Sequence, residues 1–264
     1  MLKEEEFTEY PPIFTIVEQI NKLYSKNKIE KISKLIDELE SLIDDPDLIL
    51  PTSYVLSVIA EENVELIKKE LITKLEKLLK SNNFKIQTNI ISILGFFVLA
   101  NSNFIQEYFP SFIELIDVED QDLRDNLHYF IQDFLKNNAN LFNFYIYKIL
   151  NALLIENNQE NVVLLLKYLD FIKLEATTFN DLYQLRNILK LLIQNYSKDK
   201  TTDLFLIIIK ILSKFYPSLQ DINFQSLTVA EINNLLDNTF LMKKSIFKGF
   251  NELKDIITKI KNSK

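Results

Sequence analysis

Apolar residues along this chain recur at helical spacing, in segments that break about every twenty residues. The breaks are rich in Asn, Asp and Ser, and the segments between them contain almost no Gly or Pro. Each segment is long enough for about four to five helical turns. The pattern therefore predicts a succession of helices of similar length, joined by short polar turns.

These segments define where we expect each helix to begin and end. In order along the chain, the expected helices cover residues 12–25, 28–43, 52–60, 64–80, 84–100, 104–116, 121–136, 141–155, 160–174, 179–196, 201–216, 228–236 and 241–261. The one long irregular connection, residues 218–227, separates the last two expected helices from the others.

Polar residues at the helix ends support several of these bounds. Asp120 or Asp122 is expected to cap the helix 121–136, and Thr228 with Glu231 has the spacing of a capping box. Pairs of Asn at 82–83, 137–138 and 157–158 stand where a helix-ending residue in the left-handed conformation is needed. Asn is expected to take this role because the chain has only two Gly residues.

Two consecutive segments form a unit of about 38 residues, and one such unit carries a recognisable motif. Within residues 108–134, a first helix with an early Pro110 is followed by an acidic turn containing Asp117 and Asp120. Leu123-Arg124 then opens the second helix. This arrangement resembles a HEAT repeat, a helix pair that buries its apolar face by stacking on its neighbours.

Weaker copies of the motif precede it. Residues 71–95 end in Leu94-Gly95, which is similar to the HEAT pattern, but they carry Gln87 where that pattern has Arg. Residues 42–47 resemble the inter-helix turn of a third copy, and the resemblance extends over about residues 28–216. Because only one copy keeps the Arg, we expect stacking to rest mainly on packing of Leu, Ile and Phe.

The resemblance implies an all-α fold, a right-handed α-α superhelix (a HEAT/armadillo-like solenoid) of about five to six helix pairs. Residues 1–27 would form an N-terminal capping helix, 28–217 the repeat array and 218–264 the C-terminal capping helices, in one continuous domain. The helix 84–100 is apolar nearly all round, so we expect it to be buried between neighbours in the middle of the array.

Composition limits the other classes of protein. Two Gly residues leave little room for phosphate-binding loops or hairpin turns, and the absence of Cys excludes disulfides and thiolate metal sites. No apolar run approaches the ~20 residues that span a bilayer, and the acidic N-terminus is unlike a secretory signal. With a net charge of −7, general binding of nucleic acid is not expected. We therefore expect a cytoplasmic protein.

The chain offers little for catalysis or metal binding. His128 is the single histidine, and the nearest serine, Ser111, belongs to another expected helix, so we expect no hydrolytic triad and place His128 at the flank of its helix. Hydroxylases and DNA glycosylases of the HEAT fold need more His, or Trp and a basic face. The acidic run from Asp117 to Asp122 lacks the Gly and Glu positions of an EF-hand loop. We predict no enzymatic activity, no cofactor and no bound metal.

One face of the helix 121–136 is the first candidate partner-binding surface. Asp125, Tyr129 and Gln132 are expected opposite the core, with Asp133 and His128 at the edges of that face. An exposed Tyr flanked by acidic residues suits a protein partner with basic segments. The alternative is an ordinary solvated face on which Tyr129 packs against a neighbouring helix.

The last expected helix is amphipathic and basic. One stripe is apolar, and lysines, among them Lys243, Lys244, Lys248 and Lys254, occupy the flanks and the back. We interpret this helix as the terminal cap that a solenoid requires. The alternative is contact with an anionic surface, a membrane or a nucleic acid, through these lysines.

These observations favour a non-enzymatic scaffold or adaptor for protein–protein interactions. HEAT-like proteins act as such scaffolds in vesicle coats, nuclear transport and chromosome-organising complexes, so the resemblance implies the same class of activity. The alternative from another class is a binder of anionic surfaces that acts through the basic C-terminal helix.

Removal of residues 239–264 separates the two interpretations of that helix. If it is a cap, the truncated protein should lose thermal stability or solubility, because the flank of the last repeat becomes exposed to water. If it binds anionic surfaces, the truncated protein should keep its melting temperature and lose salt-sensitive flotation with anionic liposomes. Differential scanning fluorimetry and flotation at low and moderate salt distinguish the two results.

Overall fold

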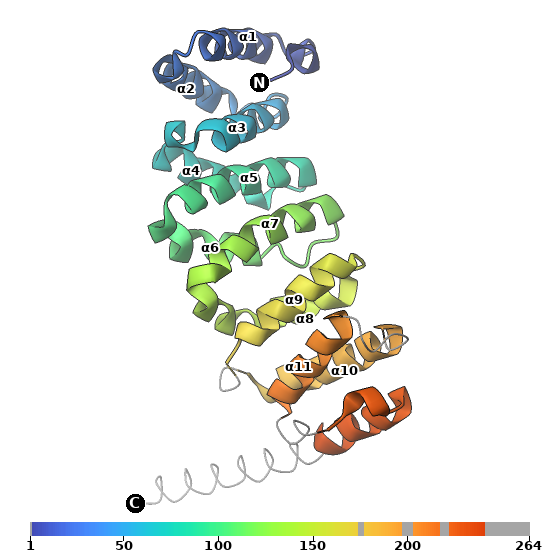
Figure 1. Cartoon of the computed structure of the whole chain (residues 1–264). Helices are drawn as coiled ribbons and strands as arrows, with labels where there is room; N and C mark the ends of the chain where they lie inside the picture. Colours follow the sequence, from blue (N-terminus) through green and yellow to red (C-terminus); the bar gives the residue numbers. More distant parts are fainter. Residues whose placement is uncertain (1, 174–176, 197–202, 217–221, 241–264) are drawn as a thin grey trace, which may run out of the picture. The chain divides into compact units, whose positions relative to one another are not determined.

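The computed structural model describes residues 2–173, 177–196, 203–216 and 222–240, and every regular element among them is a helix (Figure 1). The predicted all-α class is therefore confirmed for the described residues. The chain divides into two compact units, Met1–Asn138 and Ala139–Lys264. The prediction of one continuous domain stays a prediction, and each unit is described by itself.

The described part of the N-terminal unit is built of α-helices with short 3-10 helices at several junctions. The 3-10 helix η1 (Glu4–Phe7) precedes the first α-helix, and η4 (Lys77–Lys80) follows the fourth. The α-helices are α1 (Pro11–Ser25), α2 (Ile32–Leu42), α3 (Ile49–Asn63), α4 (Lys69–Glu76), α5 (Phe84–Ala100), α6 (Ile105–Ile113) and α7 (Gln121–Asn138).

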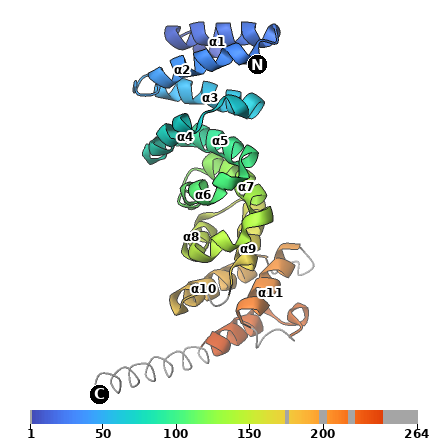
Figure 2. The same cartoon turned by 90° about the vertical axis from the view of Figure 1, so that its left-hand side faces the viewer.

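These helices alternate between two rows (Figures 1 and 2). Helices α1, α3, α5 and α7 contact one another in turn and form the first row, while α2, α4 and α6 form the second row. Helix α5 packs against α3 and α7 within its row and against α4 and α6 of the second row. Its central residues, including Ile90, Ile91 and Leu94, have no exposed surface, so the predicted burial of this helix is confirmed.

A ladder of hydrogen bonds joins successive helices of the first row. Asn89 of α5 donates from Nδ2 to Ser53 Oγ of α3, at 3.0 Å. On the next helix of the first row, Asn126 of α7 donates from Nδ2 to Ser92 Oγ at 3.0 Å and to the Thr88 carbonyl at 3.1 Å. Both Asn side chains are partly buried, and an amide group shielded from water is costly when unpaired, so these bonds add directional register to the expected apolar packing.

Two side chains at the start of the first-row helices secure the turns that precede them. Arg124 is buried, and its Nη1 donates to the carbonyls of Val118 and Glu119 at 2.6 and 2.9 Å. In the first turn of α5, Gln87 Nε2 donates to the carbonyls of Leu79 and Ser81 at 2.7 and 2.9 Å. Gln87 therefore binds the turn carbonyls as Arg124 does, although the sequence pattern predicted Arg there.

Ion pairs connect the second-row helices at their solvent-facing ends. Lys68, at the start of α4, lies 2.7 Å from Asp37 of α2, and the next residue, Lys69, lies 3.0 Å from Glu107 of α6. The Lys69 ammonium is also 4.3 Å from the centre of the Phe104 ring. These side chains are about half exposed, so each ion pair contributes little to stability.

The expected role of the Asn pairs was wrong. Among the described residues other than Gly, only Asn27 has a positive φ, of 51°. Asn83 and Asn158 instead precede helices and cap them: Asn83 Oδ1 accepts from the Lys85 backbone N–H at 3.0 Å, and Asn158 does the same for Glu160. Asn is a preferred N-cap residue, which explains why these two Asn residues begin helices instead of ending them.

The predicted helix 64–80 is interrupted in the structure. A 3-10 turn, η3 (Val64–Leu66), comes first, and the chain is extended at Ile67 and Lys68 before α4 begins. Ile67 is buried from this extended segment, so an apolar residue that fitted the helical pattern reaches the core without being helical. The predicted helix 141–155 is likewise divided, into η6 (Ala139–Phe144) and α8 (Ile146–Ile155).

The buried arc of α7 is wider than the sequence indicated. Leu127 is fully buried, and His128 is also buried, at 1% exposure, and not at the flank of the helix. The physical reason is that α7 contacts both α5 of its own row and α6 of the second row. Two packing partners cover more of a helix surface than the single apolar stripe predicted.

In the described part of the C-terminal unit, consecutive α-helices also pack against each other in pairs. It contains α8, α9 (Gln159–Phe171), α10 (Phe179–Tyr196), α11 (Asp203–Phe215) and a helix at 229–240. Helix α8 contacts α9 and α10, while α11 contacts α9 and α10.

Polar contacts attach the helix 229–240 to α10. Asp237 lies 2.7 Å from Lys190 and 3.5 Å from Arg186. The capping box predicted for this helix is confirmed, because the Thr228 backbone N–H donates to the Glu231 carboxylate at 2.7 Å and the Glu231 N–H to Thr228 Oγ1 at 3.3 Å. The expected helix 241–261, with Lys243, Lys244, Lys248 and Lys254, lies outside the described residues.

Within the described residues, no single helix is both long and apolar enough to cross a membrane. Only Phe84–Ala100 taken together with Ser102–Ile113 meets the length and composition requirements, and these two segments are bent by 118° relative to each other.

Gly95 tests the packing between α5 and α7. A Cβ atom at this position would lie 2.3 Å from Cδ1 of Phe130, a buried ring that also packs edge-on against Phe96. Gly95→Ala should therefore destabilise the protein by about 1–3 kcal/mol in urea denaturation, although Ala is normally favoured over Gly inside a helix.

The exposed Lys85 on the same helix provides the control, since Lys85→Ala should change stability by less than about 0.5 kcal/mol. Combining Gly95→Ala with Phe130→Leu should cost less than the sum of the single changes, because a smaller side chain leaves room for the added methyl group. A Gly95→Ala protein as stable as the parent would contradict the close contact.

Candidate partner-binding groove

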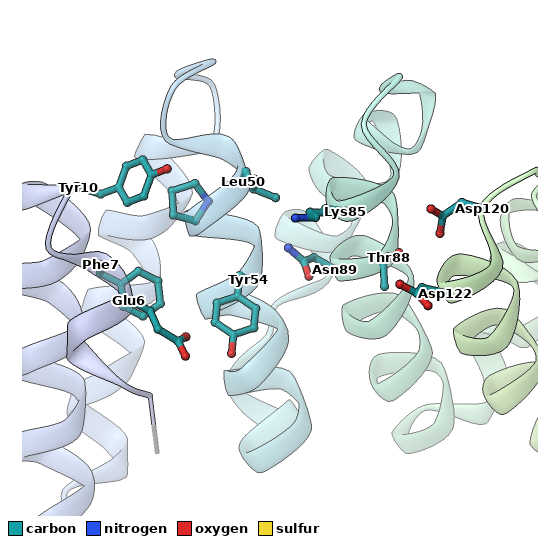
Figure 3. A pocket seen from close by; sticks show the side chains of 11 residues that line it. Glu6, Phe7, Tyr10, Leu50, Tyr54, Lys85, Thr88, Asn89, Asp120 and Asp122 are labelled. Atoms are coloured by element: carbon teal, nitrogen blue, oxygen red, sulfur yellow. The ribbon is translucent and has the colours of Figure 1, made fainter.

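A groove of about 370 Å³ crosses the N-terminal turns of three first-row helices (Figure 3). It begins at the segment around η1, passes over α3 and α5, and reaches the start of α7. All of its lining residues belong to the N-terminal unit. They are Glu6, Phe7, Tyr10, Leu50, Pro51, Tyr54, Lys85, Thr88, Asn89, Asp120 and Asp122.

The first end of the groove is aromatic and carries one carboxylate. Phe7 is buried and stacks on Tyr54 of α3, with ring centres 6.1 Å apart and planes at 26°. Tyr54 keeps 40% of its surface exposed, so a face or edge of the ring remains open to a ligand. Partial burial raises the pKa of Tyr54 above its ordinary value, and the nearby Glu6 carboxylate adds to that rise. This end therefore offers an aromatic surface beside a negative charge.

The middle of the groove is polar and carries a positive charge. Asn89 is held by its bond to Ser53, and the Thr88 hydroxyl donates to the Phe84 carbonyl of its own helix at 2.9 Å. Lys85, on the first turn of α5, is exposed and is the single basic residue among those lining the groove.

The second end of the groove is acidic. Asp120 caps α7, because its Oδ1 accepts the Leu123 backbone N–H at 2.9 Å, which confirms one of the two predicted caps. Asp122 lies in the first turn of α7 and is exposed. Carboxylates are favoured at this place by the helix dipole. With Glu6, the groove has three carboxylates against one ammonium group, so it carries a net negative charge.

The partner-binding face predicted from the sequence continues from this acidic end along α7. Asp125, Tyr129 and Gln132 are exposed and Asp133 is half-buried, so the expected side of the helix faces solvent. Their spacing from Asp122 is that of one helix face. Tyr129 is 57% exposed and touches Phe130 edge-on, with ring centres 5.0 Å apart.

Two of these acidic residues already have local partners. Gln121 Nε2 donates to Asp125 at 2.7 Å, and Lys136 lies 2.5 Å from Asp133.

Sequence reasoning missed the aromatic end of the groove. Glu6 and Phe7 lie in η1, before the first α-helix, and Tyr54 lies on α3, and the sequence pattern singled out none of the three. One feature of the sequence could have indicated this end of the groove. Phe7 is a single apolar residue within an acidic stretch, and such a side chain is expected to be buried against a neighbouring helix.

The two residues considered for catalysis, His128 and Ser111, lie on different helices. His128 is buried within α7, while Ser111 of α6 donates to the Glu76 carboxylate of α4. Among the described residues there is no group of three or more His, Cys, Asp or Glu side chains placed to hold a metal ion. The arrangement at the groove suits recognition of a ligand through charge, an aromatic surface and hydrogen bonds.

Comparisons with known proteins give no family assignment. No family model matches the chain, and searches of curated proteins and of solved structures find no similar protein.

The two acidic residues at the start of α7 should differ in their effect on stability. Asp120→Ala removes the helix cap and should cost about 0.5–2 kcal/mol of unfolding free energy. Asp122→Asn should cost less than about 0.5 kcal/mol, because that side chain is exposed and does not form the cap. Urea denaturation of both variants measures the difference, and equal losses would contradict the assigned cap.

Proposed function

We propose that this protein is a non-enzymatic scaffold for protein–protein interactions, built as a right-handed solenoid of HEAT-like repeats. The recurrence of equivalent contacts in the N-terminal unit supports the repeat assignment. Asn89 and Asn126 bond to the preceding helix of the first row, and Gln87 and Arg124 bond to the preceding turn. Repeats of this kind create extended surfaces that are suited to binding other proteins.

The observation that carries the proposed function is the exposed strip on the first row. It combines the groove, with its open Tyr54 ring and three carboxylates, and the α7 face with Tyr129 and Asp125. Exposed Tyr side chains provide large contact areas at low entropic cost, and acidic groups select partners of opposite charge. We therefore propose a protein partner that presents a basic segment.

The alternative function concerns a different part of the chain. Binding of a membrane or nucleic acid would require Lys243, Lys244, Lys248 and Lys254, all of them outside the described residues. The acidic groove and α7 face would repel phosphate groups. The truncation and flotation experiment described above distinguishes this alternative from the scaffold.

Site-specific cross-linking in native cells tests the proposed surface. A photoreactive phenylalanine analogue should form covalent adducts with another protein when it replaces Tyr129, because that side chain is exposed on the proposed strip. The same analogue in place of Lys77, which is exposed on η4 in the region of the second row, is the matched control.

Mass spectrometry of the two samples identifies the adducts. A protein captured at position 129 and not at position 77 would support the scaffold. Equal capture at both positions, or no adduct at position 129, would contradict it.

A further inference from the structure

The charges of the groove are separated along its length. Glu6 lies beside Tyr54 at one end, and Asp122 lies on α7 at the other, with Lys85 between them on α5 (Figure 3). A ligand that satisfies all three groups must carry two positive charges that are kept apart. Its middle must not be positive, because Lys85 would repel it.

The spacing of the helices indicates how far apart those charges must be. From α3, which carries Tyr54, to α7, which carries Asp122, the groove crosses two interhelical steps. Packed helices are separated by about 8–10 Å, so the helices that carry Tyr54 and Asp122 are about 16–20 Å apart. An extended peptide advances about 3.3–3.4 Å per residue, and this distance corresponds to about five or six residues.

The alternation of side chains in an extended peptide decides whether the two basic residues are five or six positions apart. Successive side chains point to opposite sides, so two residues face the same surface only when they are an even number of positions apart. Six positions place both basic side chains toward the groove, whereas five positions turn one of them away.

The helix ends do not convert the groove into an anion site. Helix N-termini attract anions through their free N–H groups. At α5, however, Asn83 already accepts the Lys85 and Ile86 N–H groups, and at α7 Asp120 accepts that of Leu123. At α7 the negative Asp120 and Asp122 side chains thus offset the positive end of the dipole, and at α5 the Asn83 side chain occupies two of the N–H groups.

We propose that the groove binds an extended peptide segment of a partner protein with two basic residues six positions apart and neutral or acidic residues between them. One basic side chain lies against the Tyr54 ring and pairs with Glu6, where a cation–π contact adds to the charge interaction. The other pairs with Asp122. This inference rests on the proposed scaffold function and specifies the partner that the groove recognises.

Fluorescence anisotropy with synthetic peptides tests the spacing. The probe is a labelled eleven-residue peptide of Ser, Ala and Gln with Lys at positions 3 and 9, and the comparison peptide has the same composition with Lys at positions 3 and 6. At low salt, the first peptide should bind the full-length protein about 1.5- to 5-fold more tightly, since it forms one exposed ion pair more than the comparison peptide. The difference should shrink when salt is added.

Variants of the protein identify the groups responsible. The double variant Glu6→Gln, Asp122→Asn should weaken binding of the 3,9 peptide by roughly 2- to 25-fold and abolish the preference for its spacing. The double variant Glu5→Gln, Glu119→Gln removes two exposed carboxylates that do not line the groove and should leave the preference unchanged. Lys85→Gln should allow a third Lys at position 5 or 7 to be tolerated.

The possible results separate this inference from the proposed function. Equal binding of the two peptides, or a preference that survives Glu6→Gln, Asp122→Asn, overturns the spaced recognition. So does the absence of binding by either peptide up to millimolar concentration. The scaffold function itself is tested separately by cross-linking, and it fails if position 129 captures no protein or captures no more than position 77.

Discussion

The close approach of successive helices in the first row is the constraint on which the N-terminal unit depends. At the crossing of α5 and α7, a side chain of any size at position 95 would collide with the Phe130 ring. That ring in turn packs against Phe96 and Phe112, so displacement at one point is transmitted to both rows. The core is close-packed, and such cores resist small changes in volume.

Hydrogen bonds give this apolar packing a defined register. Apolar faces of helices can slide past one another at modest cost, whereas an amide buried without its partner is penalised. Asn89 and Asn126 form similar bonds on α5 and α7, and Gln87 and Arg124 bind the segments that precede these helices. Together they align the first turns of α3, α5 and α7, and those turns form the floor of the groove.

The groove therefore takes its properties from the alignment of the first-row helices. Equivalent positions on successive helices face the same side, so a few side chains become a row of ligand contacts across the unit. Departures from repetition give that row its chemistry. Lys85 lies in the first turn of α5, and Asp120 and Asp122 lie at the start of α7. At the other end of the groove, η1 adds Glu6 and Phe7. The resulting separation of charge is the basis for proposing a ligand with spaced basic residues.

The sequence by itself determined the helical class, most helix positions and the exposed side of α7, because each depends on local periodicity and on capping. The bounds of α5 and α10 agree with those expected, and Asp120, Thr228 and Glu231 cap as predicted. The local sequence pattern did not predict the position of a side chain where contacts with other parts of the fold decided it. His128 is buried by two neighbours, Ile67 reaches the core from an extended segment, and Gln87 takes the place of Arg by binding carbonyls of the segment before its own helix. Only the tertiary structure could decide that Glu6, Tyr54 and Asp122 share one groove, because residues so distant in sequence are brought together by packing, which one-dimensional periodicity does not encode.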